Sequence, residues 1–207
     1  MPAHPSTDPV QLQEVAVHVA GLAAGLVARR REEVLREHAV RAKSSATDPV
    51  TQADTESEQL IRRELAARRP HDAILGEEQG GVKNTSGLRW VVDPIDGTVN
   101  FLYGLPFYAV SVAVQQDGHT IAGAVVEVGS GLVFAAAKGH GATLNGQPLH
   151  CNVVHEARMA LVATGFGYEA DRRRTQGGVL AALLPAVRDV RRVGAASLDL
   201  CAVAAGW

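Results

Sequence analysis

One twelve-residue stretch, residues 90–101, constrains the fold of this chain more than any other part of the sequence. It reads Trp-Val-Val-Asp-Pro-Ile-Asp-Gly-Thr-Val-Asn-Phe. Its apolar beginning, Trp90–Val92, predicts a buried strand. The strand is expected to end at Asp93, because Pro94 has no N–H group to donate to a neighbouring strand. The chain must therefore turn directly after a buried strand.

The turn brings two acids to the start of a helix. Asp93 and Asp96 stand three residues apart, and Gly97 and Thr98 follow, where a new helix can begin. Carboxylate oxygens favour a metal cation, whereas the N–H groups and the dipole at a helix start favour an anion. The stretch therefore predicts a site that holds cations and a phosphate together.

The overall composition limits the class of protein. The chain has 207 residues, 46% of them hydrophobic, and a formal net charge of −2, which is typical of a soluble globular protein and gives no electrostatic case for binding nucleic acid. The only cysteines, Cys151 and Cys201, are too few for a disulfide scaffold and fit a reducing compartment. The sequence shows no signal peptide and no uninterrupted apolar run of roughly 18 residues. We expect a cytoplasmic protein with neither a membrane nor a nucleic acid as partner.

Two helices are expected in the first third of the chain. Asp8-Pro9 is a typical helix start, and the helix that follows carries an apolar stripe. The stripe consists of Leu12, Val15, Val19, Leu22 and Leu26. A second helix is expected to begin at Thr51 or Asp54 and to end at Pro70, with Leu60, Ile61 and Leu65 facing inward. The segment between the helices, residues 40–49, reads as a connector.

The middle of the chain predicts strands. Residues 73–76 form a short strand, and residues 79–87 are polar and glycine-rich, which indicates a mobile loop. Further strand-like runs follow at 109–114, 120–128 and 131–137, and Asn145-Gly146 marks another hairpin. Short strands separated by tight turns predict an antiparallel meander.

A strand–helix–strand–helix pattern closes the sequence. Strands are expected at 160–164 and 189–193, and helices at 172–184 and 195–205. The pattern indicates the beginning of a second α/β layer that has only two strands. We expect a layered α/β (α+β) fold with an α+β metal-binding subdomain over residues 8–155. Residues 156–207 would begin an α/β substrate subdomain.

Acidic residues recur at the predicted ends of strands and helices. They are Asp48, Asp54, Glu77, Glu78, Asp93 and Asp96. Oxygen ligands without a nearby histidine or cysteine select Mg²⁺ or Mn²⁺ rather than zinc. Two such ions about 4 Å apart can clamp a phosphoryl group for in-line displacement by water.

The spacing allows roles to be assigned to several of these residues. Asp93 lies where it could bridge two ions, with Glu77 completing one site and Asp96 the other. The Ile95 carbonyl comes from a turn and can serve as a further ligand. Thr98 could orient the attacking water. The alternative is that these acids are ordinary turn formers.

One role is left open by the residues alone. Either Asp48 or Asp54 could accept the proton of the attacking water, and their spacing does not decide between them. Each also has a simpler interpretation, since Asp48 precedes a proline as turn formers do and Asp54 can cap a helix.

Four motifs together carry a family resemblance. They are the stretch 90–101, the acidic motif Asp48-Pro-Val-Thr-Gln-Ala-Asp54, the segment Gly76-Glu77-Glu78, and Val193-Gly-Ala-Ala-Ser197. In this order they resemble the inositol monophosphatase family, most of all its actinobacterial members. The resemblance implies a layered α/β/α/β/α sandwich and a Mg²⁺-dependent, lithium-sensitive, dimeric phosphatase. Its implied substrate is a small phosphorylated polyol, most simply myo-inositol monophosphate.

The resemblance also implies site roles. Glu77, Asp93 and the Ile95 carbonyl would bind the first of two or three Mg²⁺ ions, and Asp93 and Asp96 the second, with Mn²⁺ as a possible substitute. Thr98 would pair with Asp54, rather than Asp48, to activate water. The implied substrate-binding residues are Asp93, Ile95, Asp96, Gly97, Thr98, Gly194, Ala195 and Ala196.

The resemblance leaves other functions open. Relatives of this type act on fructose 1,6-bisphosphate, histidinol phosphate or 3′-phosphonucleotides, and some serve as RNA-associated accessory proteins. A non-catalytic role is a further alternative. The implied C-terminal part, with a Trp-Asp motif whose aspartate would complete the second metal site, is not in the sequence. We therefore expect this chain by itself to release phosphate weakly or not at all.

Overall fold

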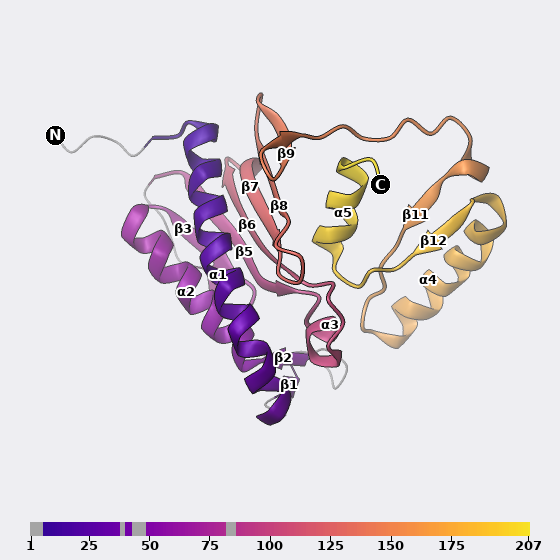
Figure 1. Cartoon of the computed structure of the whole chain (residues 1–207), viewed down its shortest axis with the longest axis horizontal. Coiled ribbons are helices and arrows are strands. Elements are labelled where there is room, and N and C mark those ends of the chain that lie inside the picture. The colour runs from indigo at the N-terminus through magenta and orange to yellow at the C-terminus, as the bar shows by residue number, and fades with distance from the viewer. Residues whose placement is uncertain (1–5, 38–39, 43–48, 82–85) are drawn as a thin grey trace.

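Two long helices cover one face of an eight-stranded sheet, and the C-terminal elements lie on the other side (Figure 1). The computed structural model describes residues 6–37, 40–42, 49–81 and 86–207. The helices are α1 (Pro9–Glu37), α2 (Gln52–Arg68), α3 (Thr98–Tyr103), α4 (Ala170–Leu183) and α5 (Ala196–Ala204), with 3₁₀ turns η1 (Ala157–Met159) and η2 (Leu184–Ala186). This arrangement confirms the predicted layered α/β class.

The large sheet contains the predicted meander. It has the order β10-β9-β8-β7-β6-β5-β3-β4, and consecutive strands from β5 to β10 pair antiparallel. The strands are β3 (Ala73–Gly76), β4 (Gly80–Gly81), β5 (Leu88–Asp96), β6 (Ala109–Gln116), β7 (His119–Glu127), β8 (Val133–Ala137), β9 (Gly141–Leu144) and β10 (Gln147–Pro148). Asn145 and Gly146 both have positive φ, as a type I′ hairpin turn requires. Strand β3 runs parallel to β5, which sets the ends of both strands at one edge of the sheet.

The connector predicted over residues 40–49 is wrong in part. Strands β1 (Val40–Ala42) and β2 (Pro49–Thr51) pair antiparallel there. Three-residue strands are too short to produce a periodic pattern, so the turn-forming residues of this segment predict a connector instead. Residues 43–48 lie outside the described part of the chain, as do residues 82–85 of the predicted mobile loop.

The buried face of α1 differs from the predicted stripe. Leu12 and Val19 are buried as expected, but Leu22 is 40% exposed. Alanines complete the buried face instead: Ala16, Ala20, Ala23 and Ala24. A pattern built on large aliphatic residues passes over alanine, whose small side chain lets the helix lie close to the sheet. The span Pro9–Arg31 is long and apolar enough to cross a membrane, but its buried side chains, Leu12 and Val19 among them, pack in the protein core.

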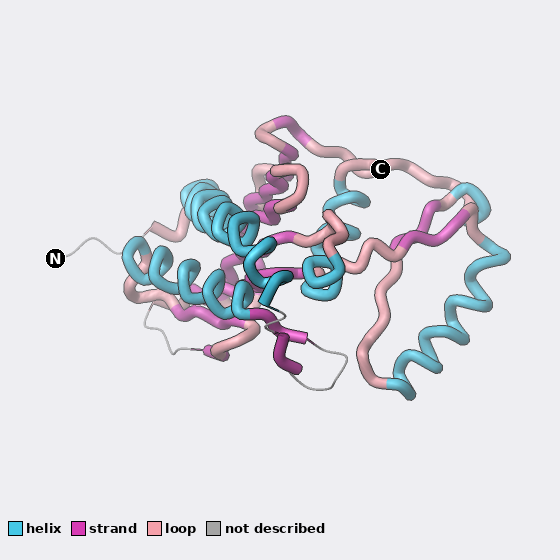
Figure 2. The backbone as a smooth tube through the Cα atoms, turned by 60° about the horizontal axis from the view of Figure 1, so that its bottom comes forward, coloured by secondary structure: helices cyan, strands magenta, loops and turns pink. Residues whose placement is uncertain are grey.

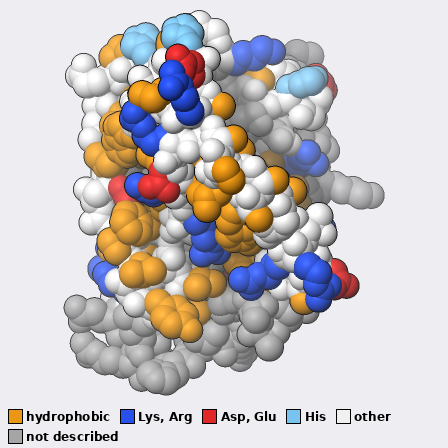
Figure 3. All heavy atoms as spheres, turned by 90° about the vertical axis from the view of Figure 1, so that its right-hand side faces the viewer, with side chains coloured by type: hydrophobic (Ala, Val, Ile, Leu, Met, Phe, Trp, Pro, Cys, Tyr) orange, Lys and Arg blue, Asp and Glu red, His pale blue; other side chains and the backbone are white. Residues whose placement is uncertain are grey.

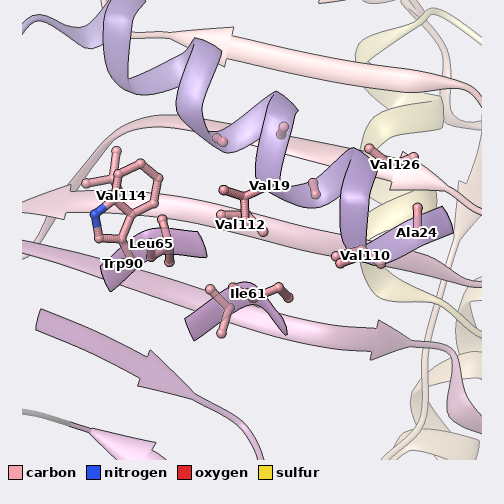
Figure 4. Packing of buried hydrophobic residues seen from close by; sticks show 14 of the residues in the cluster. Val19, Ala24, Ile61, Leu65, Trp90, Val110, Val112, Val114 and Val126 are labelled. Atoms are coloured by element: carbon pink, nitrogen blue, oxygen red, sulfur yellow. The ribbon is translucent and has the colours of Figure 1, made fainter. Parts of the chain in front are cut away.

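The core lies between these helices and the sheet. Figure 4 shows Trp90, Val112 and Val114 from the strands meeting Val19 of α1 and Ile61 and Leu65 of α2. The indole Nε1 of Trp90 donates to Asp72 Oδ2 at 2.9 Å, and Asp72 pairs with Arg69 at 2.7 Å. The buried start of β5 is thus held by packing and by one charged pair.

The C-terminal elements form a second, smaller group. Strands β11 (Leu161–Ala163) and β12 (Asp189–Arg191) pair in parallel, with α4 beside them (Figure 2). No residue of α4 is buried, whereas α5 packs against β6 and β7 on the sheet face opposite α1. A cavity of about 530 Å³ lies between α5 and the sheet, and its lining is mostly apolar. The four expected elements are present, and none of their bounds is shifted by more than two residues.

Candidate active site

A bulge at the end of β5 brings the two central aspartates to one side of the strand. Asp93 pairs with Ser111 and Asp96 with Ala109, so β5 has one more residue than β6 between these pairs. In a regular strand, residues three apart point to opposite faces, and the extra residue cancels this difference. The prediction that the strand ends at Asp93 is therefore wrong, because Pro94 is absorbed in a bulge and pairing resumes at Asp96.

The bulge and the helix after it are linked by short-range hydrogen bonds. The Ile95 N–H donates to Asp93 Oδ1 at 3.2 Å, and the Thr98 hydroxyl donates to the Ile95 carbonyl at 2.9 Å. Thr98 begins α3, as predicted, and Gly97 precedes it with φ of 93°. A Cβ atom at Gly97 would also lie 2.9 Å from the Phe107 carbonyl oxygen. Both the positive φ and this close contact therefore require glycine at this position.

Helix α2 delivers Asp54 to the same place. Asp54 lies in the first turn of α2 and is fully buried. Its Oδ1 lies 3.5 Å from the Thr98 hydroxyl oxygen. The structure therefore brings together the two residues that the resemblance pairs for water activation. Asp48, the alternative, lies outside the described residues.

Three further carboxyl groups lie around that of Asp93. The pKa of Asp93 is raised to about 9, mostly by burial and also by the negative charges of Glu77, Asp96 and Asp54 and a hydrogen bond with Glu77. Glu77 follows β3, which is parallel to β5, so both strands deliver acids to one edge of the sheet. Such a concentration of negative charge is stabilised by a cation.

The donor set fits a hard divalent cation. It consists of carboxylate oxygens together with the Ile95 carbonyl, which matches Mg²⁺ or Mn²⁺ and not zinc. Among the described residues, no three acidic, histidine or cysteine side chains already stand close enough to enclose a metal ion. The metal roles assigned to Glu77, Asp93, Ile95 and Asp96 stay predictions.

Asp96 is held by the C-terminal elements. Its Oδ1 accepts the Ala196 N–H at 3.2 Å and its Oδ2 accepts the Ser197 N–H at 2.6 Å, so it caps α5. Asn100 adds a second link by donating to the carbonyls of Phe107 and Val193, at 2.6 and 2.8 Å. The predicted substrate segment, residues 194–196, is thereby fixed beside the bulge.

The nearby thiol is not placed for catalysis. Burial raises the pKa of Cys201 to about 11, and the charge of Asp96 contributes to the same shift. A thiol with such a pKa stays protonated at neutral pH, which makes it a poor nucleophile.

Two polar residues of α2 were missed in the sequence. Ser57 and Glu58 are fully buried, and they share a helix face with Asp54 and Ile61. Ser57 donates to the Pro94 carbonyl at 3.3 Å, and Glu58 accepts the Glu78 N–H at 2.7 Å. Their signal was present, since spacings of three and four residues from Asp54 place both on the inward face.

Comparison with known proteins decides the family. The sequence model of the inositol monophosphatase family matches residues 8–207. The chain belongs to the inositol monophosphatase family. It is 52% identical to a protein named inositol-1-monophosphatase from Mycobacterium leprae, over 98% of this chain and 75% of that protein.

Solved structures of family members share the fold. Mycobacterium tuberculosis SuhB superposes with a TM-score of 0.85 at 47% identity, covering 97% of this chain and 76% of that one. A SuhB protein from Bartonella henselae gives 0.89 at 34% identity, covering 95% and 75%. An Escherichia coli relative named Nus factor SuhB is 35% identical, over 93% of this chain and 72% of that protein. The chain thus spans about three quarters of the length of these family members.

Proposed function

We propose that the residues of this chain form the site of a phosphatase that hydrolyses a phosphate monoester in a Mg²⁺-dependent reaction, with myo-inositol monophosphate as the substrate. The observation that carries the proposal is the convergence of Asp54, Glu77, Asp93 and Asp96 beside the start of α3. Membership of the family supports it, because the Mycobacterium leprae relative is named inositol-1-monophosphatase. Uncatalysed hydrolysis of such esters is among the slowest reactions known, so most of the acceleration must come from charge stabilisation.

In this proposal, four residues would bind the cations. Glu77, Asp93 and the Ile95 carbonyl would hold one cation, and Asp93 and Asp96 a second. Mg²⁺ bound there would supply charge neutralisation for the phosphate during displacement.

The start of α3 would hold the phosphate itself. The backbone N–H groups at Gly97 and Thr98 would donate to its oxygens, since a helix start leaves such groups without intrahelical partners. The Thr98 hydroxyl would orient the attacking water molecule. Asp54 Oδ1, which lies 3.5 Å from that hydroxyl, would accept the proton of the water. Gly194, Ala195 and Ala196 would contact the polyol.

A substrate panel tests the proposal. Phosphate release is measured with myo-inositol 1-phosphate, fructose 1,6-bisphosphate, histidinol phosphate and a 3′-phosphonucleotide, with Mg²⁺ or with EDTA. We expect the inositol ester to give the highest kcat/KM of the panel even though release by this chain alone is expected to be weak, and we expect Asp93→Asn to lower Mg²⁺-dependent release to the level seen with EDTA. The exposed Asp171→Asn serves as the matched control. Release that survives both EDTA and Asp93→Asn would contradict the proposal.

Three further properties are proposed from the family resemblance. They are inhibition by lithium, assembly of a homodimer and a location in the cytoplasm. Lithium titration of the same assay and light scattering of the purified protein check the first two. The alternative suggested by relatives named Nus factor, binding to RNA or its polymerase, would appear as RNA retention in a gel-shift assay.

A further inference from the structure

Glu58 is a buried carboxylate that the proposed reaction does not use. It lies one turn after Asp54 on the inward face of α2, and its exposed fraction is 0%. Removing a carboxylate from water is costly unless its oxygens gain hydrogen bonds and a counter-charge. The partners of Glu58 therefore indicate what the residue holds in place.

Those partners belong mostly to the segment that follows β3. Glu58 Oε2 accepts the Glu78 N–H at 2.7 Å, and Oε1 accepts the Gln79 N–H at 3.1 Å. Two successive backbone N–H groups thus close around one carboxylate, as in an anion-binding nest. Arg62 supplies the counter-charge at 2.8 Å and also donates to the Gly80 carbonyl.

The backbone before Glu77 is held against the same carboxylate. A Cβ atom built on Gly76 would lie 2.2 Å from Glu58 Oε1 and 2.3 Å from Cδ. Only glycine lets the chain pass this close. Glu58 therefore fixes the chain on both sides of Glu77, by contact with Gly76 and by hydrogen bonds to Glu78 and Gln79.

We propose that Glu58 is a positioning residue for the cation site, which holds the turn 76–79 so that the Glu77 side chain is directed at Asp93. The inference rests on the proposed function, because it takes Glu77 as a ligand of the cation. Glu77 already hydrogen-bonds with Asp93 in the structure. Glu58 itself contacts neither cation nor substrate and acts through the backbone alone.

A Mn²⁺ titration of the purified chain, followed by the electron paramagnetic resonance of free Mn²⁺, tests this role. Glu58→Gln keeps the side-chain shape, but it replaces one accepting oxygen by an NH₂ group. That NH₂ group would face an N–H donor of Arg62, Glu78 or Gln79, so at least one hydrogen bond is lost. We expect the Mn²⁺ dissociation constant to rise about 10- to 100-fold, as for other residues that orient metal ligands. Glu64→Gln is the matched control, because Glu64 pairs with Arg68 on the exposed side of α2. The Mn²⁺ dissociation constant of Glu64→Gln should equal that of the wild type.

The double variant separates this inference from the proposed function. If Glu58 acts through Glu77, Glu58→Gln should weaken Mn²⁺ binding in the wild type but add nothing in a Glu77→Gln background. Weakening by Glu77→Gln together with no effect of Glu58→Gln would overturn the inference alone. An unchanged affinity in Glu77→Gln would overturn the proposed metal role of Glu77 itself.

A second variant decides the matter if Glu58→Gln does not fold. Gly76→Ala leaves every charge in place but forces its new methyl group onto the Glu58 carboxylate. It should weaken Mn²⁺ binding by a similar factor with an unchanged far-UV circular dichroism spectrum. Wild-type affinity in a folded Gly76→Ala protein would overturn the inference.

Discussion

At the scale of single residues, the charge state of Asp93 gives a testable pH dependence. Its pKa of about 9 in the folded chain stands far above the value near 4 of an unfolded aspartate. Between these values the folded state keeps a proton that the unfolded state releases, so the free energy of unfolding falls as pH rises. Asp93→Asn removes this contribution. In urea unfolding with EDTA, the variant should gain stability relative to the wild type from pH 5 to pH 8. A constant difference over this range would be the contrary result.

A second residue-scale prediction concerns the charged pair beneath Trp90. Asp72 accepts from Arg69 and from the Trp90 indole, and both charged residues are buried. Asp72→Asn leaves the Arg69 guanidinium without a negative partner and should cost about 3–5 kcal/mol of unfolding free energy. Asp171→Asn, which breaks the exposed pair with Arg174, should cost less than about 0.5 kcal/mol. Equal losses in chemical denaturation would refute this ranking.

The acids of the candidate site can be predicted from the sequence, but the residues that hold them in place cannot. Asp93 and Asp96 were predicted from a local pattern of strand, proline and glycine. Glu58 was missed because its role depends on the distant turn at Glu78, which no local pattern shows. Acidic residues that lie within one short segment can be predicted from the sequence. Hydrogen bonds between α2 and the segment after β3, which are distant in the sequence, cannot.

At the scale of elements, Asn100 links the start of α3 to the segment before α5. Asn100 is 4% exposed, and its side-chain amide donates to two backbone carbonyls, those of Phe107 and Val193. Asn100→Ala removes both hydrogen bonds, each worth roughly 1 kcal/mol, so amide exchange in α5 should become about tenfold faster or more. Amides of β6 and β7 should keep their rates.

The control for this prediction is another asparagine with a similar bond. Asn152 donates to the Gly206 carbonyl at 2.9 Å but is exposed. Asn152→Ala should change exchange in α5 by less than about threefold. Unchanged exchange in Asn100→Ala would mean that α5 is held mainly by its packing and by Asp96.

Helices and strands were predicted correctly where the sequence pattern is local. The predictions failed where small side chains fill the buried face of a helix and where a bulge continues a strand. The meander β6–β10 was predicted because strand-like runs and tight turns identify each hairpin separately. The inward face of α1 was assigned partly wrongly because Ala16, Ala20 and Ala23, rather than Leu22, fill it. The end of β5 was placed too early because a bulge keeps pairing after Pro94.

At the scale of the whole molecule, burial is unevenly distributed. Side chains of the main core are packed between α1, α2 and the sheet, but α4 has no buried residue. Figure 3 shows the side of the molecule that carries the C-terminal elements, where hydrophobic and basic side chains lie exposed together. Exposed apolar side chains from these elements include Leu161, Val179, Leu184 and Leu200.

This distribution predicts where proteolysis begins. Local opening of α4 costs little because few apolar contacts are lost, and Arg172, Arg173 and Arg174 offer cleavage sites there. Brief trypsin treatment should therefore cut within residues 158–192 and leave a fragment that retains the large sheet. Mass spectrometry identifies the first cut and also tests the predicted subdomain boundary between residues 155 and 156. First cuts within β5–β8 would contradict the expected order of stability.

The most direct measurement on the site is the binding of inorganic phosphate in the presence and absence of Mg²⁺. Calorimetric titration of the wild-type chain should show phosphate binding that requires Mg²⁺, because the carboxylates around Asp93 repel the anion until a cation is bound. Asp93→Asn should lose this Mg²⁺-dependent binding. Phosphate binding that is equally strong with Mg²⁺ and with EDTA, or unaffected by Asp93→Asn, would show that these four carboxylates do not form a cation and phosphate site.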